Sequence, residues 1–235
     1  MSHPPQVAAG RALLRVEERP GWLVVRFARP QTLVSWAIVG SPRRTGDAVA
    51  WCQVRNEDLP PGLDPKRLLQ RRLRAEGLGG ARTVGLLTSA HVDRHEQAAH
   101  AAAGVHARCV ATVGLGNALR VGDETTASSG RRLGTINLVV AVSRPLAPAA
   151  LLETLAIAAE ARTAAILDAD VPSVRSGARA TGTGTDCIVV AAPVEPRGAA
   201  YAGLHTPIGQ VVGGAVYEAV HAGALRWKEA RACRA

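Results

Sequence analysis

The 235-residue chain has no uncharged apolar run of about 18 residues or more, so the sequence predicts no membrane-spanning helix. Its first residues also lack the apolar core and cleavage pattern of a signal peptide. The four cysteines (Cys52, Cys109, Cys187 and Cys233) form no CxxC pair, which disfavours a disulfide framework or a zinc knuckle. We therefore expect a cytoplasmic protein in a reducing compartment, with no membrane partner.

Aromatic residues are scarce as well. They make up 3% of the chain, which leaves few platforms on which nucleic-acid bases could stack. Lysine is limited to Lys66 and Lys228, so the net charge of +9 comes mainly from arginine. The basic residues cluster at 66–74, where we expect the polar face of an amphipathic helix. We predict no nucleic-acid partner.

Signatures of several common enzyme classes are missing. The chain contains neither a GxxxxGK[ST] nucleotide loop nor a GxSxG nucleophile elbow. Gly182-Thr183-Gly184 precedes a strand instead of following one, and Cys187 stands where a dinucleotide fingerprint has its third glycine. The sequence gives no support to a nucleotide cofactor.

What is present is a series of short apolar runs and a few long helical patterns. Runs with strand character lie at 22–28, 33–39, 48–54, 83–88, 106–115, 135–143 and 187–194. Helical patterns lie at 65–77, 90–103, 148–168 and from 207 onward. The early strands without intervening helices favour an α+β fold: a single domain at 21–225 whose mixed, largely antiparallel sheet packs against two long helices. Residues 1–20 would be a flexible lead-in and residues 226–235 a basic tail.

Two of the helices have clear start signals, an N-cap followed by proline, at Asp64-Pro65 and Thr206-Pro207. The buried face of the final helix is predicted from an apolar stripe: Ile208, Val211, Val212, Ala215 and Ala219. A corresponding stripe on the helix at 148–168 consists of Leu152, Leu155, Ala159, Thr163 and Ile166.

Residues 177–209 concentrate small polar groups around one buried strand. Alternating threonine and glycine from Thr181 to Thr185 ends on Asp186, and the polar segment from Tyr201 to Thr206 follows the strand. Packing alone does not account for this pattern. The segment is the first candidate for a functional site.

A histidine-rich segment offers a different site. His91 and His95 would share one face of the helix expected at 90–103, whereas the spacing of His95 and His100 does not match a metalloprotease helix. The two interpretations are a metal pair of a metal-dependent hydrolase and a solvated, histidine-rich helix.

Five segments in order resemble the adenosylcobinamide amidohydrolases, the CbiZ family. They are ATVGLGNA (111–118), GTIN (134–137), AAEARTAAI (158–166), ATGTGTDCIVV (180–190) and YAGLHTPIG (201–209). Arg162 and Ala159 depart from the lysine and threonine that are frequent in the family. The resemblance spans roughly residues 20–222.

The resemblance implies a prokaryotic enzyme of cobalamin salvage. It would hydrolyse the amide between the corrin side chain and aminopropanol in adenosylcobinamide, giving adenosylcobyric acid. Cobalt belongs to the corrinoid substrate, so no cofactor and no protein-bound metal are expected. A non-catalytic corrinoid carrier is the alternative, and a homo-oligomer is left open.

Amide hydrolysis needs a polarised carbonyl, an activated nucleophile and a proton for the leaving amine. His205 precedes a helix start whose positive end would keep its imidazole neutral, and a carboxylate could fix its tautomer. The expected catalytic residues are therefore His205, Asp186 and Glu160. Expected substrate-binding residues supply hydroxyl and amide groups: Asn117, Thr135, Asn137, Thr181, Thr183, Thr185, Tyr201 and Thr206.

Overall fold

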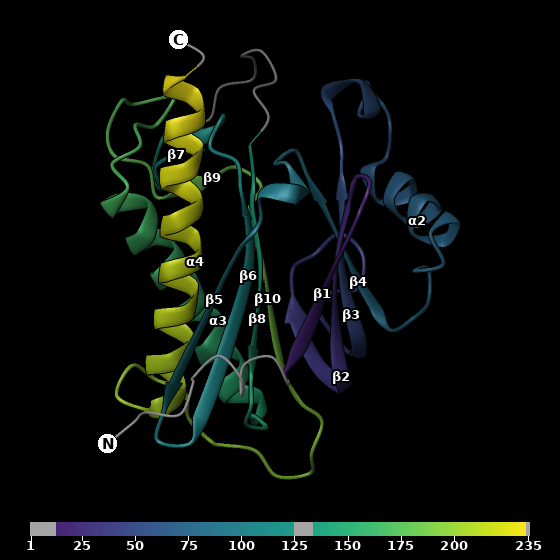
Figure 1. Cartoon of the computed structure of the whole chain (residues 1–235), viewed down its shortest axis with the longest axis vertical. Coiled ribbons are helices and arrows are strands. Elements are labelled where there is room, and N and C mark those ends of the chain that lie inside the picture. The colour runs from purple at the N-terminus through teal and green to yellow at the C-terminus, as the bar shows by residue number, and fades with distance from the viewer. Residues whose placement is uncertain (1–12, 125–133, 234–235) are drawn as a thin grey trace.

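One mixed sheet organises the chain. The computed structural model describes residues 13–124 and 134–233. Its main sheet has the strand order β4-β3-β2-β10-β8-β6-β5, with β1 paired to β2 (Figure 1). The β8–β10 and β3–β4 pairs are parallel, and the other neighbours are antiparallel, which confirms the predicted α+β class. The strands are β1 (Leu14–Arg19), β2 (Trp22–Ser35), β3 (Arg43–Gln53), β4 (Thr83–Thr88), β5 (Glu96–Ala102), β6 (Val105–Val113), β8 (Ile136–Val142) and β10 (Cys187–Pro193), and a separate small sheet pairs β7 (Ala118–Leu119) with β9 (Gly182–Thr183).

Strand β2 connects the two halves of the sheet. Residues 22–27 pair with β1, whereas residues 31–35 pair with β10. The register against β3 shifts between Arg26 and Gln31, an irregularity of the kind that bends a strand. The runs at 22–28 and 33–39, predicted as two strands, therefore belong to one long strand that ends at Ser35.

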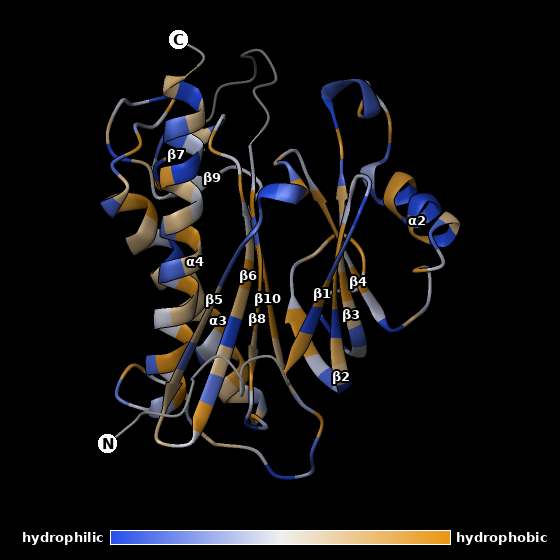
Figure 2. Cartoon of the chain, in the orientation of Figure 1, coloured by the Kyte–Doolittle hydropathy of each residue, from blue (hydrophilic) through white to orange (hydrophobic). Residues whose placement is uncertain are grey.

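The described residues form three apolar cores in this arrangement. Leu138 of β8 lies in the core beneath the long helices, and its neighbour Val139 lies in the core between the two halves of the sheet. Such alternation is what successive side chains of a strand require. A third, smaller core joins α2 to β3. Strands β8 and β10 are buried throughout because both of their faces are covered, and Figure 2 shows them as mostly hydrophobic.

The predicted helix starts are confirmed. Asp64 caps α2 by accepting from the backbone N–H of Lys66 at 2.8 Å, and Thr206 caps α4 by accepting from that of Gly209 at 3.1 Å. The predicted stripe of α4 is buried throughout. The helices are α2 (Pro65–Ala75), α3 (Pro148–Asp168) and α4 (Pro207–Ala232), with short 3₁₀ turns η1 (Asn56–Asp58) and η2 (Val92–Arg94).

The apolar stripe predicted for α3 does not coincide with the face of the helix that is buried. Leu152 is 63% exposed, and of the predicted stripe Ile166 is the buried member. Alanines take much of the buried face, with Ala158 and Ala165 fully enclosed. Small side chains allow α3 to lie close against α4 and the sheet, so the helix buries its alanine face and leaves Leu152 in solvent.

The helix expected at 90–103 is also wrong. These residues form the short turn η2 and the edge strand β5, which pairs with β6. Alanine-rich sequence favours a helix locally, but strand pairing and the cover of α4 override that preference. Gly214 of α4 shows how closely the two pack, since a Cβ there would lie 2.5 Å from Nδ1 of His100.

The chain ends are more regular than expected. Leu14–Arg19 of the supposed lead-in form β1, because their backbone pairs with β2. Residues 226–232 of the supposed tail continue α4. Residues 1–12 and 234–235 lie outside the described part. Within the described residues, no helix is long and apolar enough to cross a membrane.

Candidate active site

A cavity of about 680 Å³ opens where β8 and β10 begin and β4 ends. One side of it is polar and comes from the loops before β8 and β10 and after β6. The other side is apolar and comes from the segment after β2 and the loop before α2. The polar side chains include Asn117, Thr135, Asn137, Thr185 and Asp186; the apolar ones include Trp36, Ile38, Leu59, Pro60 and Leu63.

Hydrogen bonds hold the polar floor together. The Thr135 hydroxyl donates to the Thr185 carbonyl at 2.9 Å, and the Thr185 hydroxyl donates to the Gly134 carbonyl at 3.2 Å. Asn137 is 1% exposed, and its amide nitrogen donates to the Leu87 carbonyl at 2.6 Å. These bonds fix the starts of β8 and β10 against the end of β4, so the floor is preorganised.

Asp186 is the centre of this network. Its carboxylate accepts from the backbone N–H of Ile136 at 2.9 Å, from that of Thr183 at 3.0 Å and from the Thr183 hydroxyl. The same carboxylate forms an ion pair with Arg162 of α3, with side chains 7% and 16% exposed respectively. Four donors occupy the lone pairs of the carboxylate, which makes Asp186 an organiser of the loop.

Asn117 differs from its neighbours. Its side-chain oxygen is buried and has no hydrogen-bond partner in the described structure. A Cβ on Gly134 would lie 2.2 Å from that oxygen, so only glycine at 134 allows Asn117 its position. A buried amide oxygen without an internal partner is costly, and at the edge of a cavity it can accept a hydrogen bond from a ligand.

Thiol chemistry has little support at this site. Cys187 lines the cavity, but burial raises the pKa of its thiol to about 12. The thiolate is the nucleophilic form, and almost none is present at neutral pH.

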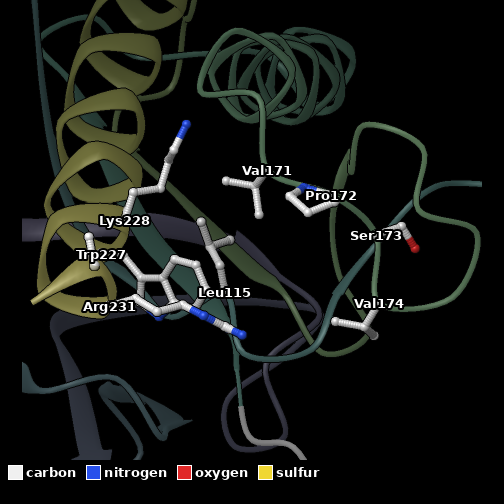
Figure 3. A pocket seen from close by; sticks show the side chains of 9 residues that line it. Leu115, Val171, Pro172, Ser173, Val174, Trp227, Lys228 and Arg231 are labelled. Atoms are coloured by element: carbon white, nitrogen blue, oxygen red, sulfur yellow. The ribbon is translucent and has the colours of Figure 1, made fainter. Parts of the chain in front are cut away.

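A second cavity, of about 510 Å³, lies beside the end of α4 and is chemically different (Figure 3). Leu115, Val171 and Trp227 give it a mostly apolar lining. Its amine and guanidinium are already engaged: Lys228 donates to the Ala169 carbonyl at 2.7 Å, and Arg231 lies over Trp227 at 5.4 Å. The first cavity, with its converging amides and hydroxyls, is the better candidate active site.

The match to known proteins decides the family. The family model described as adenosylcobinamide amidohydrolase matches residues 5–232, nearly the whole chain. The chain belongs to the adenosylcobinamide amidohydrolase family. This confirms the resemblance seen in the five sequence segments.

The individual proteins that the chain resembles match it over a shorter stretch or at low identity. An adenosylcobinamide amidohydrolase of Halobacterium salinarum is 40% identical over 89 residues, which is 38% of this chain and 35% of that protein. The match thus spans about a third of the relative's length. Among solved structures, that of the PH0078 protein from Pyrococcus horikoshii OT3 is 12% identical, with a TM-score of 0.46, covering 89% of this chain and 78% of that one.

Four of the five segments that resemble the adenosylcobinamide amidohydrolases meet around the cavity. Residues 111–118 and 134–137 supply Asn117, Thr135 and Asn137, and residues 180–190 supply Thr185 and Asp186. Residues 158–166 reach the site through the Arg162–Asp186 ion pair. Thr183 binds Asp186, and Thr181 accepts from the Val121 backbone N–H at 2.8 Å, so both support the loop from behind.

The fifth segment lies elsewhere. Asp186 lies where β10 begins, whereas the segment between β10 and α4 lies at the opposite end of the sheet: Ala199 pairs with Leu146 after β8, and Pro207 lines a cavity with Val105 and Pro145. The structure therefore does not bring the His205 imidazole together with the Asp186 carboxylate, one of the two carboxylates expected near it. Tyr201 is 69% exposed at this far end, and Thr206 serves as the cap of α4.

Glu160, the third expected catalytic residue, is exposed on α3 and does not line the cavity. Its neighbour Arg162 is the residue of that segment that contacts Asp186. A helix places positions two apart on different faces, which explains why one faces the site and the other solvent.

Sequence reasoning missed Ser89 and the apolar side of the cavity. Ser89 follows β4 and lines the cavity, and its hydroxyl makes no hydrogen bond within the described residues. Trp36 follows β2, and its indole donates to the Asp186 carbonyl at 2.7 Å. Two features of the sequence could have indicated the apolar side: a tryptophan in an aromatic-poor chain, and the proline- and glycine-rich loop at 56–65.

The proposed histidine pair for a metal does not form. His91 is exposed and precedes η2, while His95 is nearly buried and bonds to Gln97 at 2.7 Å. With no helix here, the shared face on which the pair depended is absent. Among the described residues, no group of three or more His, Cys, Asp or Glu side chains is placed to hold a metal ion.

Proposed function

We propose that this chain hydrolyses the amide between aminopropanol and the corrin side chain of adenosylcobinamide. The products would be adenosylcobyric acid and aminopropanol, and the acid would re-enter cobalamin synthesis as part of cobinamide salvage. The observation that carries the proposal is the family match over residues 5–232. The character of the cavity supports it.

The cavity suits a ligand rich in amides. No lysine or arginine stands among the described residues that line it, and its one carboxylate, Asp186, is paired with Arg162. Neutral donors and acceptors therefore face the ligand. A corrin rimmed with neutral amide groups matches such a lining better than a phosphate or an anionic sugar does.

Two polar groups of the lining are free to act on the substrate. Asn117 and Ser89 make no side-chain hydrogen bond within the described residues, whereas the hydroxyls of Thr135 and Thr185 are engaged. We assign the side-chain NH2 group of Asn117 as the donor to the carbonyl oxygen, where negative charge develops. The Ser89 hydroxyl would hold the attacking water, whose oxygen bonds to the carbonyl carbon as the C–N bond breaks and a proton passes to the amine.

No cofactor enters this proposal, because cobalt arrives with the substrate. The test is incubation of the purified protein with adenosylcobinamide, followed by quantification of both products. Equimolar release of aminopropanol and adenosylcobyric acid, retained after dialysis against a chelator, supports the proposal. Corrinoid binding without release would instead identify a carrier, and activity lost on chelation and restored by zinc would show a metal requirement.

A further inference from the structure

Trp36 combines exposure with a fixed position. It is 48% exposed at the cavity, in a chain with four tryptophans. Its ring nitrogen donates to the backbone carbonyl of Asp186 at 2.7 Å. Since Asp186 is itself held by Arg162 and by two backbone N–H groups, the indole is tied to the most constrained loop of the site. The ring is anchored without being buried.

An apolar surface extends from Trp36 around the cavity. Ile38 is 42% exposed beside it, and Leu59, Pro60 and Leu63 line the cavity from the loop before α2. We call these five residues the apolar wall. Trp36 and Ile38 are the exposed large members of this wall, and where proteins leave neighbouring large apolar side chains exposed, a ligand or partner usually covers them.

The loop that carries three of the five residues of the apolar wall is held in place. The Asp58 carboxylate accepts from the Arg55 backbone N–H at 2.7 Å and from the guanidinium of Arg72 on α2. Asp64 caps the same helix. Both sides of the cavity mouth are thus attached to secondary structure, which favours a rigid ligand over one that must reshape the site.

We propose that the indole of Trp36 packs against the flat, apolar surface of the corrin macrocycle and makes Trp36 a specificity-determining residue. This inference rests on the proposed function. The apolar wall would hold the corrin ring at the mouth of the cavity while the aminopropanol arm of the substrate reaches the polar side chains at Asn117. Aromatic contact needs no charge, in agreement with the lack of lysine and arginine among the described residues of the lining.

The test compares Trp36→Leu with Trp36→Phe, and uses Trp227→Leu in the second cavity as the matched control. For Trp36→Leu we expect about a tenfold rise in KM for adenosylcobinamide and in the Kd for adenosylcobyric acid, measured by calorimetry, with kcat little changed. Trp36→Phe should recover most of the affinity because it keeps an aromatic ring. It loses only the hydrogen bond to Asp186. Trp227→Leu should keep the Kd of the parent.

Unchanged KM and Kd in folded Trp36→Leu would overturn the inference. So would equal losses of kcat and unfolding free energy in both Trp36 variants, since that result assigns Trp36 to holding the loop. If the parent protein hydrolyses adenosylcobinamide, these outcomes concern Trp36 alone. A parent that neither hydrolyses nor binds corrinoids removes the proposed function, and this inference with it.

Discussion

Arg162 and Asp186, from α3 and from the loop before β10, form a largely buried ion pair at the back of the candidate active site. The pair joins two segments that lie far apart in the chain. Gly182 makes it possible, because a Cβ at 182 would lie 2.5 Å from both the Arg162 Nη1 and the Asp186 Oδ2. The ion pair therefore explains one of the glycines in the threonine–glycine alternation.

Removing one partner of this pair should destabilise the fold. Arg162→Ala leaves the Asp186 carboxylate buried without its cation, and we expect a loss of about 3 kcal/mol in unfolding free energy. The exposed Arg67–Asp64 pair provides the control, where Arg67→Ala should change it by less than about 1 kcal/mol. Urea titration of both variants measures the difference, and similar values for the two would contradict the assignment.

The two glycines of the alternation should behave differently. Gly182→Ala forces a Cβ into the ion pair and should cost about 1–3 kcal/mol of unfolding free energy, with lower activity. Gly184→Ala meets only Leu119 at 3.4 Å, an ordinary contact, and should change stability by about 0.5 kcal/mol or less. Equal tolerance at both positions, seen by thermal unfolding, would show that Arg162 and Asp186 can adjust.

Asn117 and Asn137 should separate catalysis from stability. The amide of Asn137 is bonded to Leu87, so Asn137→Ala should lower unfolding free energy by about 1–3 kcal/mol. Asn117 has no internal partner, so Asn117→Ala should lower kcat about 100-fold with little loss of stability. Steady-state kinetics beside denaturation curves test this, and the reverse pattern would exchange the two roles.

A substitution of His205 tests whether this histidine takes part in catalysis. His205→Ala should keep kcat within about twofold of the parent, because His205 belongs to the segment before α4, at the end of the sheet opposite Asp186. Ser89→Ala, at the cavity itself, should lower kcat more. A large fall in kcat for folded His205→Ala would return this histidine to the mechanism.

Acid should weaken the loop that carries the apolar wall. Hydrogen bonds from the Arg55 backbone and the Arg72 guanidinium hold the pKa of Asp58 below its usual value. A lowered folded-state pKa contributes stability above the unfolded pKa, about 3.9, and loses it as pH falls through the folded pKa.

The stability difference between the parent and Asp58→Asn should therefore be constant above about pH 5 and shrink below about pH 4. Urea titrations from acid to neutral pH measure this difference. Glu57→Gln, an exposed neighbour in the same turn, is the control. A difference independent of pH would mean that the Asp58 carboxylate does not stabilise the loop.

Local signals in the sequence predicted much of the fold. Strand β4 at 83–88, helix α3 at 148–168 and the caps Asp64 and Thr206 are where the sequence places them. These features depend on side chains a few residues apart, such as a cap and the N–H groups it accepts from. The helix prediction for 96–102 failed because the alanines of this segment favour a helix locally, whereas its pairing with β6 in the sheet is a tertiary contact that local propensity does not encode.

The candidate site divides in the same way. By itself, the sequence determined which loops carry amides and hydroxyls, and its motifs pointed to the family. Only the tertiary structure decided that Asp186 meets Arg162 and that the segment of His205 lies at the opposite end of the sheet. The direction of a strand separates its two ends by its full length, and pairing between distant segments depends on sheet order and register, which no local pattern encodes.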